Sequence, residues 1–125
     1  MTDSYFLPTS VPAEIFRAYD IRGIVDQQLT ESVVYGIGRA FATEALSVNQ
    51  KTIAVGRDGR LSGPSLSQAL IQGIREAGAD VLDLGAVPTP LLYFATATLS
   101  TQTGIMLTGS HNPANYNGLK MVIAG

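Results

Sequence analysis

The sequence predicts an α/β domain, layered α/β/α, with a mixed and mostly parallel sheet. Short apolar runs of strand length alternate along the chain with longer segments of helical periodicity. Polar, glycine-bearing loops follow two of these runs, as is typical where strands of an open α/β sheet end at a ligand site. The 125 residues suit one domain, whose folding buries roughly two-thirds of the unfolded surface.

The first elements follow an irregular lead-in over residues 1–13, and the domain itself spans residues 14–125. The segment Ile15–Gly23 is predicted to be a short strand that runs into a polar turn. A helix is predicted to begin at Thr30 and to end at Gln50. Its apolar face comprises Val33, Val34, Ile37, Phe41, Ala45 and Leu46.

The middle of the chain predicts a strand, a helix and a further strand. The run Thr52–Gly56 is typical of a buried strand, and the loop Arg57–Arg60 follows it. A helix begins at Ser62–Pro64, because proline is preset for the first turn, and Gly78 is its expected C-cap. The next strand is Val81–Leu84. The apolar stripe of the helix comprises Leu66, Ala69, Leu70 and Ile74.

The last part predicts a third helix, starting at Val87–Pro90, and two more strands. The first strand is Thr103–Leu107, and the loop Thr108–Pro113 follows it. A turn is expected at Asn115–Gly118, before a last strand, Leu119–Ile123. No helix fits between these two strands, so an antiparallel pair around the loop is expected.

Composition excludes several classes of function. Ten acidic and eight basic residues give a net charge of −2, and no basic stretch suits nucleic acid. No apolar run reaches the roughly 20 residues of a membrane helix, and the N-terminus lacks a signal-peptide pattern. The chain has no cysteine, which excludes disulfides and is compatible with the reducing cytoplasm. The single histidine cannot form a histidine metal site alone.

Charged residues make up 14% of the chain, against about 25% in an ordinary soluble domain. Because the apolar content is ordinary, this deficit falls on the surface. It indicates that part of the surface faces other protein, as in a domain of a longer chain.

The candidate site lies where the loops Arg57–Arg60 and Thr108–Asn112 leave their strands. The carboxyl ends of parallel strands meet at one edge of a sheet, and ligands bind there. In the second loop, Gly109 lets the backbone approach a ligand closely, and Pro113 stiffens the far side. Ser110 is therefore presented on a stiff loop. The alternative is a plain polar turn.

A serine hydrolase is excluded by the same loop. His111 is adjacent to Ser110, and adjacent residues of an extended chain point to opposite sides, so His111 is poorly placed as its base. The chain also lacks the G-x-S-x-G elbow.

Four segments, in order along nearly the whole chain, resemble motifs of the α-D-phosphohexomutase superfamily. They are Phe16–Gly23, Val55–Gly63, Gly85 with Val87–Pro90, and Thr108–Pro113 followed by Tyr116–Lys120. The chain is thus identified as a member of this superfamily. It resembles the N-terminal domain, most closely in the bacterial bifunctional phosphomannomutase/phosphoglucomutase branch.

The resemblance implies that Ser110 carries a phosphate. Such enzymes interconvert glucose or mannose 1-phosphate and 6-phosphate through this phosphoserine and a bisphosphorylated sugar. It also implies Mg²⁺, bound in part through the phosphate on Ser110, and glucose 1,6-bisphosphate as an activator. The other metal ligands are aspartates of a D-G-D-G-D type motif in the next domain, which this chain does not contain.

The resemblance also assigns roles around the serine. His111 is matched to a proton-transfer aid or phosphate contact, or else only holds the loop by a hydrogen bond. Lys120 is expected to be buried near the phosphate and to act as a base or hold charge, the alternative being a solvated side chain. Asn112 is placed among the phosphate-binding residues.

Two further positions match the family's site residues at the first strand. Arg22 would bind phosphate as a fork, and Tyr19 would offer a hydroxyl and a ring face to the sugar. The alternatives are a surface arginine and a packed tyrosine. The loop Arg57–Arg60 is predicted to be mainly structural, with an internal ion pair and with Arg60 turned toward the phosphate.

The resemblance implies a truncated domain 1, without the metal-, sugar- and phosphate-binding domains of a complete enzyme. Its expected partners are hexose phosphates and those domains, and alone it is expected to be inactive. In the truncated chain Met121–Ile123 would form an exposed apolar strand. Two alternatives remain open: a phosphoglucosamine-type mutase domain, and a non-catalytic phosphate-binding module.

Overall fold

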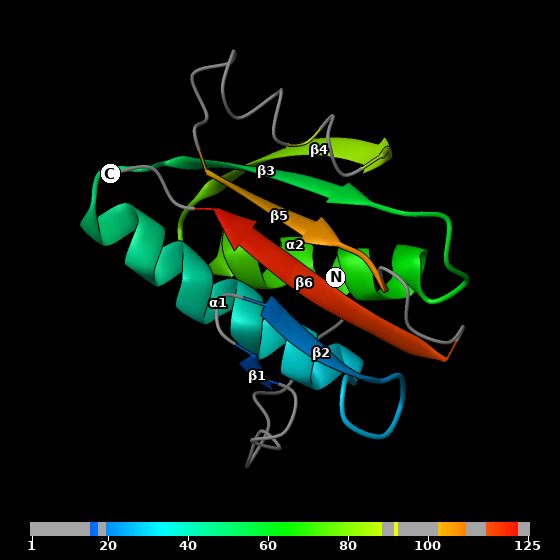
Figure 1. The fold of residues 1–125 in the computed structure, drawn as a ribbon. Helices are drawn as coiled ribbons and strands as arrows, with labels where there is room; N and C mark the ends of the chain where they lie inside the picture. The colour runs from blue at the N-terminus through cyan, green and yellow to red at the C-terminus, as the bar shows by residue number, and fades with distance from the viewer. Residues whose placement is uncertain (1–15, 18–19, 89–91, 93–102, 110–114, 123–125) are drawn as a thin grey trace, which may run out of the picture.

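The computed structural model describes residues 16–17, 20–88, 92, 103–109 and 115–122, which form one mixed sheet and two helices (Figure 1). The strands are β1 (Phe16–Arg17), β2 (Asp20–Ile24), β3 (Thr52–Arg57), β4 (Asp80–Ala86), β5 (Gly104–Leu107) and β6 (Tyr116–Val122), and the helices are α1 (Glu31–Ser47) and α2 (Gly63–Glu76). The six strands lie in the order β1-β2-β6-β5-β3-β4.

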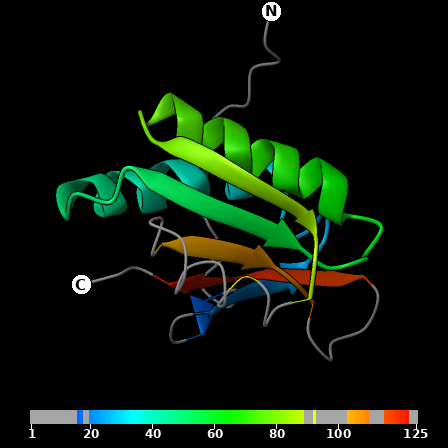
Figure 2. The same cartoon turned by 90° about the horizontal axis from the view of Figure 1, so that it is seen from above.

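Both helices cover the same face of this sheet (Figure 2). Side chains of a strand alternate between the faces, and β3 shows the division. Ile53 and Val55 belong to the main core together with the apolar residues of α1 and α2. Ala54 lies on the opposite face, where it packs with Met106 and Leu92 in a smaller cluster. The two helices thus cover one face of the sheet and a small apolar cluster lies on the other, and strands combined with helices in this way confirm the predicted α/β class.

The balance of strand directions differs from the prediction. β3 is parallel to β4 and to β5, whereas the β1–β2, β2–β6 and β5–β6 pairs are antiparallel. Among the described strands, antiparallel pairs therefore outnumber parallel ones, and "mostly parallel" was wrong. Only residues 18–19 separate β1 from β2, and only 108–115 separate β5 from β6, which is too short for a crossover helix. The predicted antiparallel pair around the loop is confirmed.

The helix ends follow the sequence signals. The hydroxyl of Thr30 accepts a hydrogen bond from the amide of Val33 at 3.1 Å and so caps α1. Pro64 lies in the first turn of α2. Gly78, with φ of +104°, follows its end in a backbone conformation that favours glycine. Ser62 stands at the N-cap of α2, but its side chain does not cap the helix.

The predicted turn over Asn115–Gly118 was wrong for its last three residues, which are the first residues of β6. Gly118 pairs with Arg22 of β2, and a β-carbon there would lie 2.4 Å from the carbonyl oxygen of Ile21. The glycine thus permits close strand approach rather than a turn. β6 is bonded to β2 as far as Lys120 and to β5 as far as Val122, so most of it is an interior strand rather than an edge. Met121, which is partly exposed, pairs only with Ile105 of β5.

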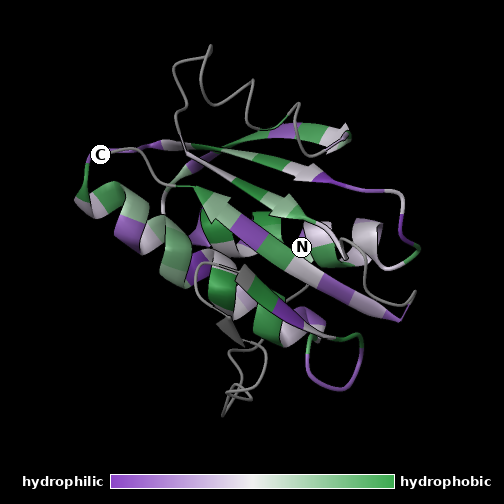
Figure 3. Cartoon of the chain, in the orientation of Figure 1, coloured by the Kyte–Doolittle hydropathy of each residue, from purple (hydrophilic) through white to green (hydrophobic). Residues whose placement is uncertain are grey.

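Two predicted segments lie outside the described residues: the lead-in over residues 1–13, and the third helix except for Leu92, which has helical geometry and is fully buried. In Figure 3 the central strands are mostly hydrophobic, and hydrophilic residues begin where β3 runs into its loop. Neither described helix is both long and apolar enough to span a membrane.

Candidate active site

The candidate site lies at the carboxyl ends of β3 and β5. Arg57, at the end of β3, pairs with Leu107, at the end of β5. The amide of Asp58 then donates to the carbonyl oxygen of Leu107 at 3.0 Å, which extends the pairing one residue beyond the strands. The loop after β3 and the segment leading to Ser110 therefore leave the sheet side by side (Figure 1). The predicted meeting of two polar loops is confirmed for their described residues.

The carboxylate of Asp58 joins the two loops. Its Oδ2 accepts hydrogen bonds from the hydroxyl of Thr108 at 2.8 Å and from the amide of Gly109 at 3.1 Å. Its Oδ1 accepts from the amide of Arg60 at 3.1 Å, which closes a tight turn within its own loop. One carboxylate thus binds three donors from two segments.

Arg60 lies across the base of the serine loop. Its Nε is 3.6 Å from Oδ2 of Asp58, which confirms the predicted ion pair inside the loop Arg57–Arg60. Its Nη1 donates to the carbonyl oxygen of Tyr116 at 3.3 Å. A β-carbon at Gly109 would lie 1.9 Å from Nε of Arg60, so the guanidinium lies directly against this glycine. The side chain of Arg60 is only 17% exposed.

The return side of the loop is also bonded. The amide of Thr108 donates to the carbonyl oxygen of Gly118 at 2.8 Å. Nδ2 of Asn117 donates to the hydroxyl of Ser62 at 2.9 Å, and its Oδ1 accepts from the amide of Gly118. The side chain of Asn117 is buried, with both its donor and its acceptor groups bonded. Both chain ends that border residues 110–114 are therefore fixed to the loop between β3 and α2.

Four of the predicted site residues lie outside the described residues: Tyr19, Ser110, His111 and Asn112.

Two predicted site residues lie together on one face of the sheet. Arg22 of β2 pairs with Gly118, and Lys120 of β6 pairs with Asp20 and with Met106. Residues directly opposite share a face, as do residues two apart in a strand. Arg22 and Lys120 therefore lie on the face of Met106, away from α1 and α2. Both are partly exposed, so Lys120 is less buried than expected.

Sequence reasoning missed Asp58 and Asn117 as residues that build the site. Asp58 was predicted only as a partner within its own loop, and Asn117 was assigned to a turn. The polar loops at one sheet edge were a signal for the first. Asn117 is followed by Gly118, and an Asn-Gly pair normally signals a turn. No local pattern in the sequence shows that Asn117 instead lies in a strand with its side chain hydrogen-bonded.

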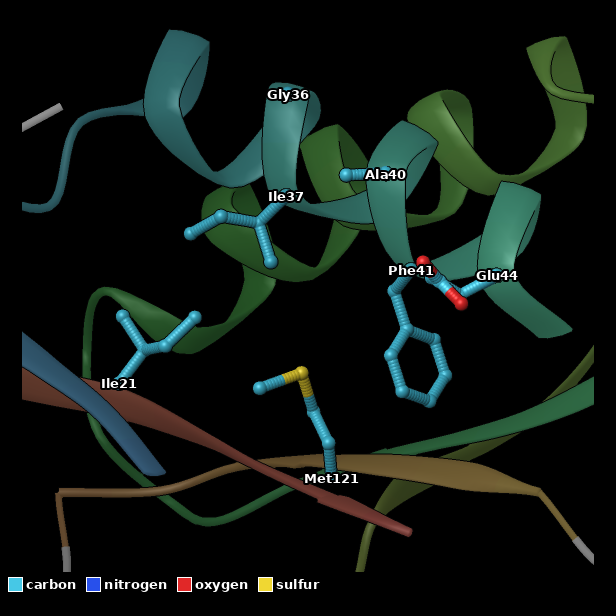
Figure 4. Close-up of a pocket in the computed structure, with 7 residues that line it drawn as sticks. All are labelled: Ile21, Gly36, Ile37, Ala40, Phe41, Glu44 and Met121. Atoms are coloured by element: carbon cyan, nitrogen blue, oxygen red, sulfur yellow. The ribbon is translucent and has the colours of Figure 1, made fainter. Parts of the chain in front are cut away.

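Two pockets lie elsewhere. A pocket of about 310 Å³ between α1 and the sheet is apolar except for the carboxylate of Glu44 (Figure 4). It opens on the helix-covered face and offers no donors for a phosphate. Arg57 lines a polar pocket between α2 and β4, together with Arg75 and Asp83, and so does not join Arg60 at the serine loop.

Comparison with known proteins gives one consistent result. Residues 13–125 match the family described as phosphoglucomutase/phosphomannomutase, alpha/beta/alpha domain I. A phosphomannomutase/phosphoglucomutase of Pseudomonas syringae is 57% identical over 115 residues, covering 92% of this chain and 25% of that protein. A phosphoglucomutase of Neisseria gonorrhoeae is 50% identical over 116 residues, covering 93% of this chain and 25% of that protein.

Solved structures agree. A phosphoglucomutase/phosphomannomutase family protein of Burkholderia thailandensis superposes with a TM-score of 0.86 at 47% identity, over 91% of this chain and 27% of that one. A putative phosphomannomutase from Thermus thermophilus superposes with a TM-score of 0.81 at 32% identity, over 86% of this chain and 25% of that one. The chain spans about a quarter of the length of these relatives.

Proposed function

Since this chain belongs to the phosphoglucomutase/phosphomannomutase family, as its domain I, we propose that it is the phosphoserine-bearing first domain of a phosphohexomutase. The whole enzyme interconverts hexose 1-phosphates and hexose 6-phosphates of glucose or mannose. One observation carries the proposal. Inside the region that matches the family, both borders of the segment with Ser110 are bonded to one loop at the carboxyl edge of the sheet.

In the proposed reaction the phosphoryl group passes from Oγ of Ser110 to the hydroxyl of the bound sugar phosphate. The P–O bond to serine breaks as the P–O bond to the sugar forms; the sugar hydroxyl loses its proton to a base, and Oγ of Ser110 takes up a proton as it leaves. The bisphosphate then reorients within the site and returns its other phosphoryl group to Ser110. We assign the proton transfers to His111 or Lys120, because both are titratable and match the family's serine loop and following strand.

The proposed phosphate contacts come from several elements. Arg22 shares a sheet face with Lys120, so two cations lie near one another on one surface. Arg60 lies against Gly109, the residue before Ser110. We assign Asn112 to the same phosphate and Tyr19 to the sugar, on the motif match alone.

Magnesium is proposed to bind through the phosphate on Ser110. Among the described residues, no three histidine, cysteine or acidic side chains form a group that could hold a metal. The aspartates proposed to complete the site belong to the next domain. When bound, Mg²⁺ would neutralise phosphate charge during transfer. We further propose glucose 1,6-bisphosphate as activator and a cytoplasmic location.

Two other functions would take the same fold. A phosphoglucosamine-type mutase would differ in domains outside this chain, and a non-catalytic module would bind phosphate without turnover. The names of the relatives, phosphomannomutase and phosphoglucomutase, favour glucose and mannose substrates. Activity of the full-length protein on glucose, mannose and glucosamine phosphates would separate the three.

The direct test is intact mass after incubation with glucose 1,6-bisphosphate and Mg²⁺. In the full-length enzyme we expect one added phosphate on the wild type and none on Ser110→Ala. Equal phosphate on both variants would refute Ser110 as the phosphorylated residue. For the isolated 125 residues we expect no mutase turnover, since the aspartates proposed to complete the metal site and the proposed sugar-binding domain lie outside them.

A further inference from the structure

We propose that Asp58 is a positioning residue for phosphoryl transfer: its carboxylate sets the backbone from which Ser110 is presented. This inference rests on the proposed function, because it assumes that Ser110 is the phosphorylated residue. Asp58 has no assigned part in the chemistry proposed above.

The contacts of Oδ2 carry the first step. This one oxygen accepts from Thr108 Oγ1 at 2.8 Å and from the amide of Gly109 at 3.1 Å. Two donors on consecutive residues fix both the position and the rotation of the peptide that leads into Ser110. Hydrogen bonds to a charged acceptor are about twice as strong as neutral ones. The side chain of Asp58 is 27% exposed, so these bonds are partly shielded from water.

The second step is that Asp58 is itself held in place. Its Oδ1 accepts from the amide of Arg60, and its own amide donates to Leu107 at the end of β5. The Arg60 side chain lies 3.6 Å from Oδ2 and donates to Tyr116 on the return side. The carboxylate thus joins a rigid strand end to the backbone before Ser110, and Arg60 links it to the backbone after the loop.

The expected consequence is kinetic. Phosphoryl transfer depends on the alignment of donor and acceptor, and a displacement of about 1 Å can cost roughly a hundredfold in rate. Asp58 bonds the loop's backbone and is not proposed to touch the sugar. Loss of its bonds should therefore lower kcat with little change in KM, whereas a substrate contact would change KM.

A graded series in the full-length enzyme tests this. Asp58→Asn retains one acceptor oxygen without the charge, and Asp58→Ala removes both acceptors. We expect kcat to fall about 10-fold in the first and about 100-fold in the second, with KM within about twofold of the wild type. Asp80→Ala is the matched control, because Asp80 is an exposed carboxylate at the opposite end of the β3–β4 pair. It should leave both constants unchanged.

Substitutions of Thr108, whose hydroxyl donates to Asp58, give a second series of variants. Thr108→Val removes the hydroxyl donor at nearly constant shape, and Thr108→Ser retains it. We expect kcat to fall about 10-fold in the valine variant and to recover in the serine variant. Because the bond that Thr108→Val removes is already absent in Asp58→Ala, the valine substitution should add little to it in the double variant.

A structural readout separates positioning from general damage. The amide proton signal of Gly109, followed by NMR in the full-length enzyme, should move upfield in Asp58→Ala and stay in place in Asp80→Ala. Thermal midpoints of all variants show whether a loss of rate merely reflects unfolding.

The outcomes are distinct. If wild-type full-length protein has no Ser110-dependent turnover, the proposed function fails, and this inference fails with it. If the wild type is active and Asp58→Ala keeps its kcat, only the inference is overturned. It is likewise overturned if Thr108→Ser is as slow as Thr108→Val, or if the Gly109 signal is unmoved in Asp58→Ala.

Discussion

The contact between Arg60 and Gly109 shows how one residue type is required by its neighbour. Gly109 was expected to let the backbone approach a ligand, but in the described structure it accommodates the Arg60 side chain, with a virtual β-carbon 1.9 Å from Nε. The guanidinium is held there by Asp58 and by the carbonyl oxygen of Tyr116. The space above Gly109 is thus already filled by protein.

Gly109→Ala should therefore displace the Arg60 side chain from Asp58 and Tyr116 and destabilise the chain by about 1 kcal/mol, the order of one lost hydrogen bond. Removal of the obstructing side chain in an Arg60→Ala background should reduce that cost. Urea unfolding of the two single variants and the double variant measures the coupling. If the losses in unfolding free energy of the two single variants simply added up in the double variant, the alanine side chain at position 109 would not be displacing Arg60.

A second residue-scale feature links the two helices. The hydroxyl of Tyr35 on α1 donates to the carboxylate of Glu76 on α2, which also accepts from Gln72. Arg39 donates to the Tyr35 hydroxyl at 3.3 Å. These bonds, that from Tyr35 first, lower the pKa of Glu76 below its usual 4.5, and the charge of Arg39 adds to the effect.

The pH dependence follows from that direction. A carboxyl whose pKa is lower in the folded state stabilises the fold above its unfolded pKa, and this contribution is lost as pH falls through the folded value. Wild type should therefore exceed Glu76→Gln in urea midpoint at pH 7, and the difference should shrink below about pH 4.5. A difference that does not vary between pH 7 and pH 3 would contradict the assignment.

At the scale of elements, α1 and α2 form one closely packed pair. A β-carbon at Gly73 of α2 would lie 2.2 Å from the carbonyl oxygen of Tyr35, and one at Gly38 of α1 would lie 2.6 Å from that of Leu70. Backbone here approaches backbone, so no flexible side chain can yield. The predicted apolar faces of both helices meet in this contact.

Gly73→Ala should separate the helices and lower the free energy of unfolding by about 1–3 kcal/mol, despite the better helix propensity of alanine. Gly59→Ala is the control, because a β-carbon at Gly59 meets nothing within 4 Å. Its stability should stay within about 0.5 kcal/mol of the wild type. If the two variants proved equally stable, close helix packing would not be the role of Gly73.

At the scale of the whole molecule, local sequence patterns predicted most helices and strands. The features that depend on pairing between distant segments could not be predicted in this way. The helices from Thr30 and from Ser62 were predictable because their start signals, the cap at Thr30 and the proline at position 64, and their apolar periodicity lie within each segment. The strand character of Tyr116–Gly118 was not, because its partner is β2, at the other end of the chain. The alternation of strands and polar loops predicted that Asp58 and Thr108 lie at the same edge of the sheet. The hydrogen bond between their side chains could be identified only from the structure.

The pairing of β2 with β6 also brings the N-terminal Arg22 onto the same face as the C-terminal Lys120. In the described sheet, β1 and β2 are joined to the other strands only through β6. The two strands approach closely at Gly118, where a virtual β-carbon would lie 2.4 Å from the carbonyl oxygen of Ile21. The contact is with backbone, so the strand itself must move if the space is filled.

Gly118→Ala should therefore loosen β2 from β6 while β3 and β4 keep their parallel pairing. Amide hydrogen exchange measures this: protection should fall in β2 and be retained in β3, which serves as the internal control. In the full-length enzyme the same variant should raise KM for the sugar phosphate, because Arg22 no longer keeps its place beside Lys120. Uniform loss of protection in both strands would mean that the sheet opens as one unit, and that Gly118 does not hold Arg22 beside Lys120.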